Sequence, residues 1–112
     1  VLIPVQPQYY AADDLTELLK VVKGTKKRFN PEIEVEGILF TMDSARYNNS
    51  KRNKKAVKEA YGKEMRVFEN SIPRSEAIAE IASEGISIFA YDSRSKGAKS
   101  YEMLAQEVLN RA

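Results

Sequence analysis

The chain has 112 residues, of which 43% are apolar and 30% are charged, and it contains neither cysteine nor histidine. This composition is typical of one globular domain or of part of one. It excludes disulfides, zinc sites built from cysteine and histidine, thiol nucleophiles and acid–base catalysis by histidine. No apolar run reaches the roughly 20 residues that a membrane-spanning helix needs.

The first half of the chain predicts two strands and two helices in alternation. Val1–Val5 reads as a strand, and the helix after it begins at Asp13 and Asp14, whose carboxylates suit a helix N-terminus. Val35–Met42 is apolar at successive positions, which indicates a strand buried on both faces and hence a parallel sheet. A lysine-rich helix is predicted over Ser50–Tyr61. The apolar stripe of the first helix is Leu15, Leu18, Leu19 and Val22.

The second half continues the alternation. Met65–Ile72 predicts a third strand, and Ser75 caps a short helix over Glu76–Ser83. Ile86–Tyr91 predicts a fourth strand, and Ser95–Arg111 predicts a last amphipathic helix. The inward residues of that helix are expected to be Tyr101, Leu104, Ala105, Val108 and Leu109.

The predicted order of elements indicates an α/β fold, with a mostly parallel sheet and helices on both faces. Ligands bind at the carboxyl ends of the strands in such sheets. Here those ends are Pro4–Pro7, Thr41–Arg46, Ile72–Arg74 and Tyr91–Arg94. Asp43 and Asp92 lie in two of them and suit either a metal or ribose contact or an ordinary turn.

Positive charge is concentrated in the middle of the chain. Arg46 to Arg66 holds eight basic and two acidic residues, whereas the whole chain has a net charge of +2. Lys51, Lys55 and Lys58 fall on one stripe of the predicted helix, where they repel one another. A polyanion would relieve this repulsion, so the pattern favours phosphate contacts with a nucleic acid or another anion. The alternative is an ordinary solvated helix face.

The chain contains no catalytic signature. There is no G-x-x-x-x-G-K-[ST] loop and no G-x-G-x-x-G sequence to bind phosphates. Arg74 follows a predicted strand, where its guanidinium could meet a phosphate or a carboxylate, or simply lie at a surface turn.

Four segments carry a resemblance to a known family: VLIPVQPQYYAADDLTELL, VEGILFTMDSAR, SIPR and IFAYDSRSKGAKSYEMLAQEVL. In order and spacing they are similar to motifs of the ParA/Soj-type chromosome or plasmid partitioning ATPases. VLIPVQPQYYAADDLTELL is similar to the family's IPVQ strand and leucine-rich helix, and VEGILFTMDSAR is similar to its EGVLLTM-D-R strand and loop. SIPR resembles VIPR, and IFAYDSRSKGAKSYEMLAQEVL resembles the family's SKGA and LAKEV ending.

The resemblance implies a deviant-Walker P-loop ATPase with a doubly wound fold, of which residues 1–112 are a single carboxyl-terminal portion. The P-loop, switch aspartates and Walker B strand precede the IPVQ strand in the family and are not in this chain. The parent is expected to bind ATP and Mg²⁺, to form a homodimer, and to bind nucleoid DNA nonspecifically in the cytoplasm. A ParB-like centromere-binding protein would be its partner, and no membrane contact is expected.

The resemblance also assigns residues. Thr41 and Met42 match positions beside the adenine ring, and Pro73 and Arg74 match the turn that closes over the base and sugar. Arg46 and Arg74 match positions tied to DNA binding, and Lys51, Arg52, Lys55 and Lys58 would enlarge that surface. No catalytic residue or metal ligand falls in the chain, so alone it is expected not to hydrolyse ATP and to bind no cofactor.

One segment departs from the family. IPRSEAIAEIASEGISI stands where the family has IPRNxxLSEAPSxGxPI, so the residues that follow Arg74 differ from the family's motif. Two other functions stay open. One is a free-standing basic α/β module that binds nucleic acid, and the other is a related ATPase of cell-division positioning. The apolar Val1–Val5 strand is also expected to be an open sheet edge through which the chain self-associates.

Overall fold

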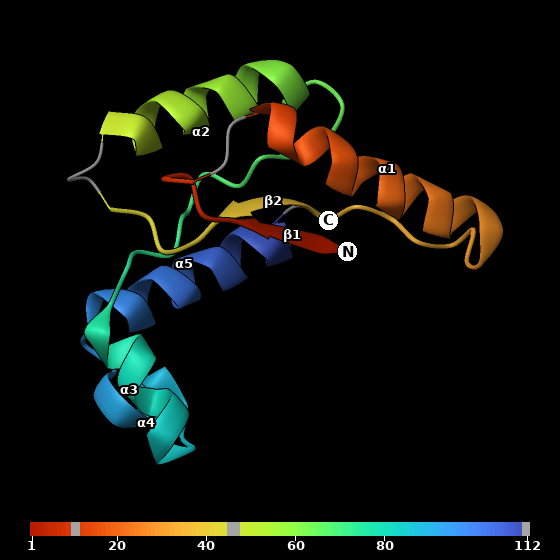
Figure 1. The fold of residues 1–112 in the computed structure, drawn as a ribbon. Coiled ribbons are helices and arrows are strands. Elements are labelled where there is room, and N and C mark those ends of the chain that lie inside the picture. The colour runs from red at the N-terminus through yellow and green to blue at the C-terminus, as the bar shows by residue number, and fades with distance from the viewer. Residues whose placement is uncertain (10–11, 45–47, 111–112) are drawn as a thin grey trace.

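The computed structural model describes residues 1–9, 12–44 and 48–110. Two strands and five helices follow one another in the described parts of the chain (Figure 1). They are β1 (Leu2–Val5), α1 (Ala12–Arg28), β2 (Gly37–Phe40), α2 (Asn48–Tyr61), α3 (Glu76–Glu84), α4 (Ile88–Asp92) and α5 (Lys96–Asn110).

The two strands form a small parallel sheet. Leu2 pairs with Gly37 and Val5 pairs with Phe40, so the strands run side by side over their whole length. All four residues of β2 are buried. The predicted parallel pairing and the burial of the second strand on both faces are therefore confirmed.

Helices cover both faces of this sheet, as predicted. Because side chains alternate along a strand, Ile38 and Phe40 face one way and Leu39 faces the other. Figure 1 shows α1 and α2 on one side and α5 on the other. The core on the first side consists of Ile3, Val5, Leu15, Leu19, Ile38, Phe40 and Val57. The core on the α5 side consists of Leu39, Phe68, Ile72 and Leu104.

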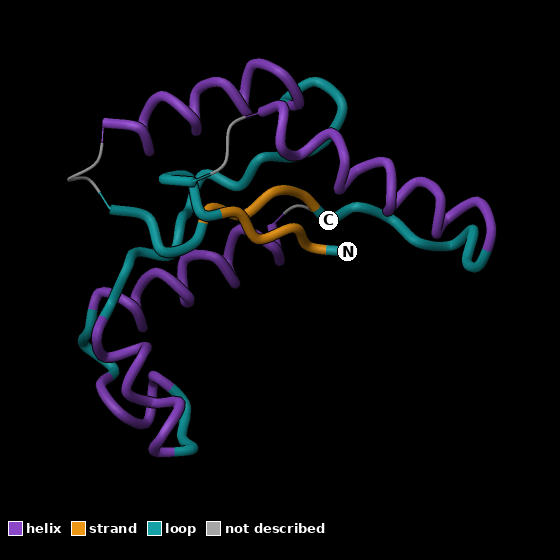
Figure 2. The backbone as a smooth tube through the Cα atoms, viewed as in Figure 1, coloured by secondary structure: helices purple, strands orange, loops and turns teal. Residues whose placement is uncertain are grey.

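The prediction of a continuous third strand over Met65–Ile72 is wrong. The segment runs beside β2, but Figure 2 shows it as a loop, and it forms only isolated bridges with that side of the sheet. Of these bridges, the one between Ile38 and Val67 joins the segment to β2, and the other, between Asp43 and Pro73, lies beyond both. The Ile38 and Phe40 carbonyls, two residues apart, accept N–H groups from Phe68 and Ile72, four residues apart. A regular parallel pair advances equally on both sides. The segment therefore contains two extra residues, which bulge out at Glu69–Ser71, where polar side chains have weak strand preference.

The predicted fourth strand at Ile86–Tyr91 is also wrong, because α4 occupies most of it. The Ser87 hydroxyl accepts the N–H of Ala90 at 3.0 Å, which caps a helix of five residues. Within α4 only Ile88 is buried. A run of apolar residues without a neighbouring strand thus forms a short helix, which projects with α3 away from the sheet (Figure 1).

The predicted Ser75 cap of α3 is confirmed. The Ser75 hydroxyl accepts the N–H of Ile78, and Gly85 ends the helix with a positive φ of 68°. The Tyr91 hydroxyl of α4 donates to the carboxylate of Glu80 in α3 at 2.5 Å. This hydrogen bond is the largest cause that raises the pKa of Tyr91, and the negative charge of Glu80 adds to it.

The face that the last helix presents to the core is predicted in part. Leu104 is buried and Val108 packs against the core, but Tyr101, Ala105 and Leu109 are exposed. The buried side of α5 begins instead at Gly97 and Ala98. Among the described residues, no helix combines the length and the apolar character needed to cross a membrane.

Candidate functional site

The loop Met65–Ile72, which runs beside β2, is here called the third segment. A hollow of about 400 Å³ lies where β2 and the third segment end. We call it the strand-end hollow. Its walls come from the end of β2, from the turn before α3, from the first turns of α3 and from one tyrosine of α5. They include Thr41, Met42, Ile72, Pro73, Arg74, Ile78 and Tyr101. The four residues that the resemblance places around a nucleotide, Thr41, Met42, Pro73 and Arg74, therefore lie around one hollow.

Backbone hydrogen bonds hold the two sides of this hollow together. The N–H of Asp43 donates to the carbonyl of Ile72 at 3.1 Å, and the N–H of Arg74 donates to the carbonyl of Asp43 at 3.1 Å. Asp43 and Pro73 form an isolated parallel bridge. Segments about thirty residues apart in the sequence are thus fixed side by side, as expected for carboxyl ends of neighbouring parallel strands.

Met42 lies in a second irregularity of the sheet. The N–H of Ile72 donates to the Phe40 carbonyl. In a regular parallel pair the Ile72 carbonyl would then accept the N–H of Met42, two residues after Phe40. It accepts the N–H of Asp43 instead, so Met42 is an extra residue. Its φ is 48°, in the left-handed region that a side chain disfavours. Bulges of this kind redirect a side chain next to a binding site, and 46% of Met42 is exposed.

The walls of the strand-end hollow combine apolar surface with a few polar groups. Met42, Ile72, Pro73, Ile78 and Tyr101 supply the apolar part. The hydroxyl of Thr41 and the guanidinium of Arg74 supply hydrogen-bonding groups and a positive charge. Such a lining suits a flat apolar ring with an anionic substituent.

The inner side of α2 is anchored at the same edge of the sheet. Nδ2 of Asn53 donates to the carbonyl of Pro7 at 2.6 Å. Nζ of Lys54 lies 2.7 Å from Oδ2 of Asp43. Asp43, which the sequence offered as a metal or ribose ligand, is thus engaged by a lysine. Asp92, the other such candidate, accepts the N–H of Arg94 at 3.1 Å in a turn.

The outer side of α2 gathers the predicted phosphate-binding lysines. Lys51, Lys55 and Lys58, here called the lysine row, are exposed and line one open hollow together with Lys54 and Glu59. Arg52 is exposed on the same helix. Arg74 lines the strand-end hollow, and Arg46 lies outside the described residues. The structure therefore unites three of the six residues predicted to bind DNA.

A further hollow of about 360 Å³ flanks β1 and shares Thr41 with the strand-end hollow. Its walls include Pro4, Val5 and Leu18. Leu18 was predicted to face the core with Leu15 and Leu19, but 43% of it is exposed. The apolar stripe of α1 therefore extends beyond the part of the helix surface that the other described residues cover.

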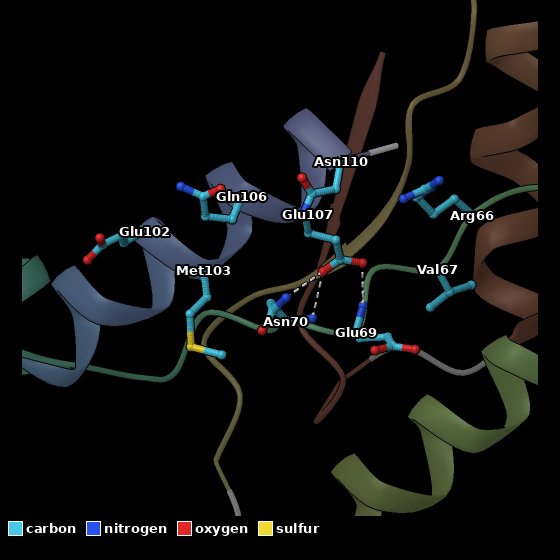
Figure 3. Close-up of a pocket in the computed structure, with 9 residues that line it drawn as sticks. All are labelled: Arg66, Val67, Glu69, Asn70, Glu102, Met103, Gln106, Glu107 and Asn110. Atoms are coloured by element: carbon cyan, nitrogen blue, oxygen red, sulfur yellow. Dashed lines mark hydrogen bonds between the residues drawn. The ribbon is translucent and has the colours of Figure 1, made fainter. Parts of the chain in front are cut away.

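Sequence reasoning missed two charged residues that organise this region. Lys54 falls between the buried residues Ser50 and Val57 of α2, a position that signals an inward side chain. Glu107 follows the buried Leu104 by three residues, which gives the same signal on α5. Figure 3 shows Glu107 in an open hollow of about 690 Å³ between α5 and the third segment.

The carboxylate of Glu107 is surrounded by donors. Its Oε2 accepts the N–H of Glu69 at 3.0 Å, and its Oε1 accepts the N–H and the Nδ2 of Asn70 at 3.0 Å and 2.7 Å. Burial raises the pKa of Glu107, but these hydrogen bonds and the charge of Arg66 together lower it below its ordinary value. Within the described parts of the chain, no three acidic residues are grouped as metal ligands would be.

The chain is similar to several curated proteins over nearly its whole length. It is 40% identical over 108 residues to the sporulation initiation inhibitor protein Soj of Bacillus subtilis, which covers 96% of the chain and 42% of the relative. It is 38% identical over 111 residues to the chromosome partitioning protein ParA of Myxococcus xanthus and to the chromosome-partitioning ATPase Soj of Treponema pallidum. These matches cover 99% of the chain and 38% and 43% of the relatives. No protein-family profile matches the chain.

Proposed function

We propose that this chain, a homologue of the ParA and Soj chromosome-partitioning proteins, forms the base-binding side of the nucleotide site of a partitioning ATPase. The chain spans about two fifths of the length of those relatives. The observation that carries the proposal is the strand-end hollow, because Thr41, Met42, Pro73 and Arg74 come from two distant segments and line it together.

The lining of this hollow fits an adenine nucleotide. Its apolar walls match the faces of a purine, and the donors of Arg74 match a ribose or phosphate oxygen. ATP with Mg²⁺, when bound, supplies the phosphoryl group whose hydrolysis changes the state of the protein. The resemblance assigns the groups that hold Mg²⁺ and the triphosphate to segments that precede the IPVQ motif. The role of this chain is then to orient the base and sugar.

The nucleotide assignment is tested with the protein translated from the complete reading frame that encodes this chain. We expect Met42→Glu to weaken ATP binding at least about tenfold, because a charged carboxylate would replace an apolar side chain against the base. Met103→Glu is the matched control, since Met103 is 56% exposed and lines the hollow beside Glu107 instead. Equal affinities of both variants and the parent, measured by calorimetry, would overturn the assignment.

We also propose that the lysine row binds DNA through phosphates. Three ammonium groups on one exposed side of α2 support this, and the inner side of the helix is held by Asn53 and Lys54. The contact would be nonspecific and sensitive to salt. In the proposed parent it would depend on an ATP-bound homodimer and be released through a ParB-like partner.

The test of DNA binding compares two triple variants that remove the same charge. Replacing the lysine row by alanine should weaken binding and lower the salt slope by about 0.9 for each phosphate that is no longer neutralised. The control replaces Lys23, Lys26 and Lys27, which are exposed on α1. If both variants lose affinity equally, DNA binding is diffuse and the lysine row is not its site.

The fold of the parent would continue across β1. Within the described residues β1 pairs only with β2, and Leu18 and Pro4 line an open hollow beside it. We infer that another parallel strand pairs with this edge in a doubly wound sheet. The 112-residue chain alone should then self-associate through β1. A clean monomer in sedimentation at ~100 μM, a concentration suited to weak contacts, would contradict this.

One alternative is a basic α/β module that binds nucleic acid without ATP, and the lysine row favours it as the second candidate. The two functions differ in one measurement, the effect of ATP on DNA affinity. The reading frame upstream of the codon for Val1 gives an independent answer. A P-loop motif there supports the ATPase, and a stop codon, or a start codon immediately before Val1, supports the module.

A further inference from the structure

The bulge at Glu69–Ser71 decides which residues of the third segment reach the strand-end hollow. Beyond the bulge, the N–H of Ile72 donates to the Phe40 carbonyl at 2.9 Å. Had the pairing continued without the bulge, Asn70 would occupy that position. Pro73 and Arg74 would then lie two residues, or roughly 6–7 Å, farther along the sheet. The bulge therefore places them beside Met42.

Two backbone N–H groups of the bulge, those of Glu69 and Asn70, are satisfied by one side chain from α5. Figure 3 shows Glu107 reaching from the helix to the N–H groups of Glu69 and Asn70 and to the Asn70 side chain. A carboxylate is well suited to this, because both oxygens accept and neither donates. A glutamine in its place would turn an NH₂ group toward one of the donors.

We propose that Glu107 is a positioning residue: its carboxylate holds the Glu69–Ser71 bulge open and so fixes the register that brings Pro73 and Arg74 to the strand-end hollow. The inference rests on the proposed function only where it takes the strand-end hollow to bind a nucleotide. The same helix also contributes Tyr101 to the hollow. The helix α5 thus contacts both the bulge, through Glu107, and the strand-end hollow, through Tyr101.

The charged groups around Glu107 come from two elements. Arg66 and Glu69 lie on the third segment, and Glu102 lies on α5 five residues before Glu107. The core on this side of the sheet is apolar and consists of Leu39, Phe68, Ile72 and Leu104. The positive charge of Arg66 lowers the pKa of Glu107 and so favours its ionised carboxylate.

The first test follows backbone amides by ¹H–¹⁵N NMR and needs no nucleotide. At pH 7 we expect Glu107→Gln to shift the amide signals of Glu69, Asn70, Asp43 and Arg74. Glu102→Gln removes the same charge from the same helix and the same hollow. It should leave the amide signals of Asp43 and Arg74 unchanged. An unchanged Arg74 signal in Glu107→Gln would overturn the proposal.

A pH titration of the unmodified protein covers the case in which the variant does not fold. The Glu69 and Asn70 amides should titrate together with the Glu107 carboxyl. If these amides do not follow Glu107, its carboxylate does not hold the bulge and the proposal fails.

The second test measures ATP affinity in the protein from the complete reading frame. Glu107→Gln should bind ATP about tenfold more weakly per folded molecule, and Glu102→Gln should bind as the parent does. A merely structural role would lower the melting temperature without changing the affinity of the folded fraction. If the unmodified protein binds no ATP, the proposed function fails, and the amide shifts still decide whether Glu107 sets the register.

Discussion

Lys54 of α2 and Asp43 at the end of β2 form an ion pair with Nζ and Oδ2 2.7 Å apart. Only 10% of the Asp43 side chain is exposed, so the pair is shielded from water. The contact joins the inner side of α2 to the strand-end hollow. It thereby links the two surfaces to which we assign functions.

Removal of the Asp43 charge should leave Lys54 without its partner in a half-buried position. We expect Asp43→Asn to lower the free energy of unfolding by about 1–3 kcal/mol, measured by urea denaturation. The control is Glu17→Gln, which breaks the exposed Glu17–Lys20 pair on α1 and should cost at most about 0.5 kcal/mol. Equal costs would mean that the Asp43–Lys54 pair does not anchor α2.

Replacing each of two glycines by alanine should change the stability of the fold in opposite directions. A Cβ on Gly37 would lie 2.6 Å from the carbonyl oxygen of Arg66, and the φ of Gly37 is 150°. Gly37→Ala should therefore destabilise the fold by at least about 2 kcal/mol. At Gly24 the Cβ would meet only the end of the flexible Arg28 side chain. Gly24→Ala should stabilise α1 by up to about 1 kcal/mol. Thermal melts of both variants check the pair.

The lowered pKa of Glu107 predicts an acid-sensitive contribution to stability. Because the folded-state pKa lies below the unfolded value of about 4.3, the contribution is complete above that value. It disappears as the pH falls through the folded-state pKa. The stability difference between the parent and Glu107→Gln should be constant from about pH 5.5 to 7 and should narrow in acid. A difference that stays constant into acid would contradict the hydrogen bonds described for Glu107.

Ser87 distinguishes a helix from a strand at α4. If Ser87 caps a helix, its replacement by alanine should lower the free energy of unfolding by about 0.5–2 kcal/mol. Replacement by valine should lower it at least as much. Aspartate should retain most of the stability. In a strand, valine would instead be favourable. Chemical denaturation of the alanine, valine and aspartate variants therefore tests the local structure directly.

Sequence patterns predicted the elements whose signals are local and repeated. The stripe of Leu15 and Leu19, the apolar β2 segment and the Ser75 cap each have a period or a spacing that tertiary contacts did not override. The strand predicted at Ile86–Tyr91 is wrong because burial, which a single sequence does not display, is limited to Ile88 in α4.

The candidate site was predicted only in part, and the resemblance supplied most of it. Composition and spacing led to the lysine row, whereas Thr41 and Met42 were placed by the similarity to ParA and Soj. The bulges at Met42 and at Glu69–Ser71 could not be predicted, because they depend on hydrogen bonds to residues distant in the sequence. The carboxylate of Glu107 is visible as a partner only when α5 is seen beside the third segment.

The two sides of α2 do separate tasks. Asn53 and Lys54 attach the helix to the ends of the strands, while the three side chains of the lysine row are exposed and take no part in these two contacts. Substitutions on the outer side therefore leave the attachment intact. Evolution or an engineer could retune the surface potential of this helix step by step, at little risk to the folded chain, and adapt the same scaffold to polyanions of different charge density.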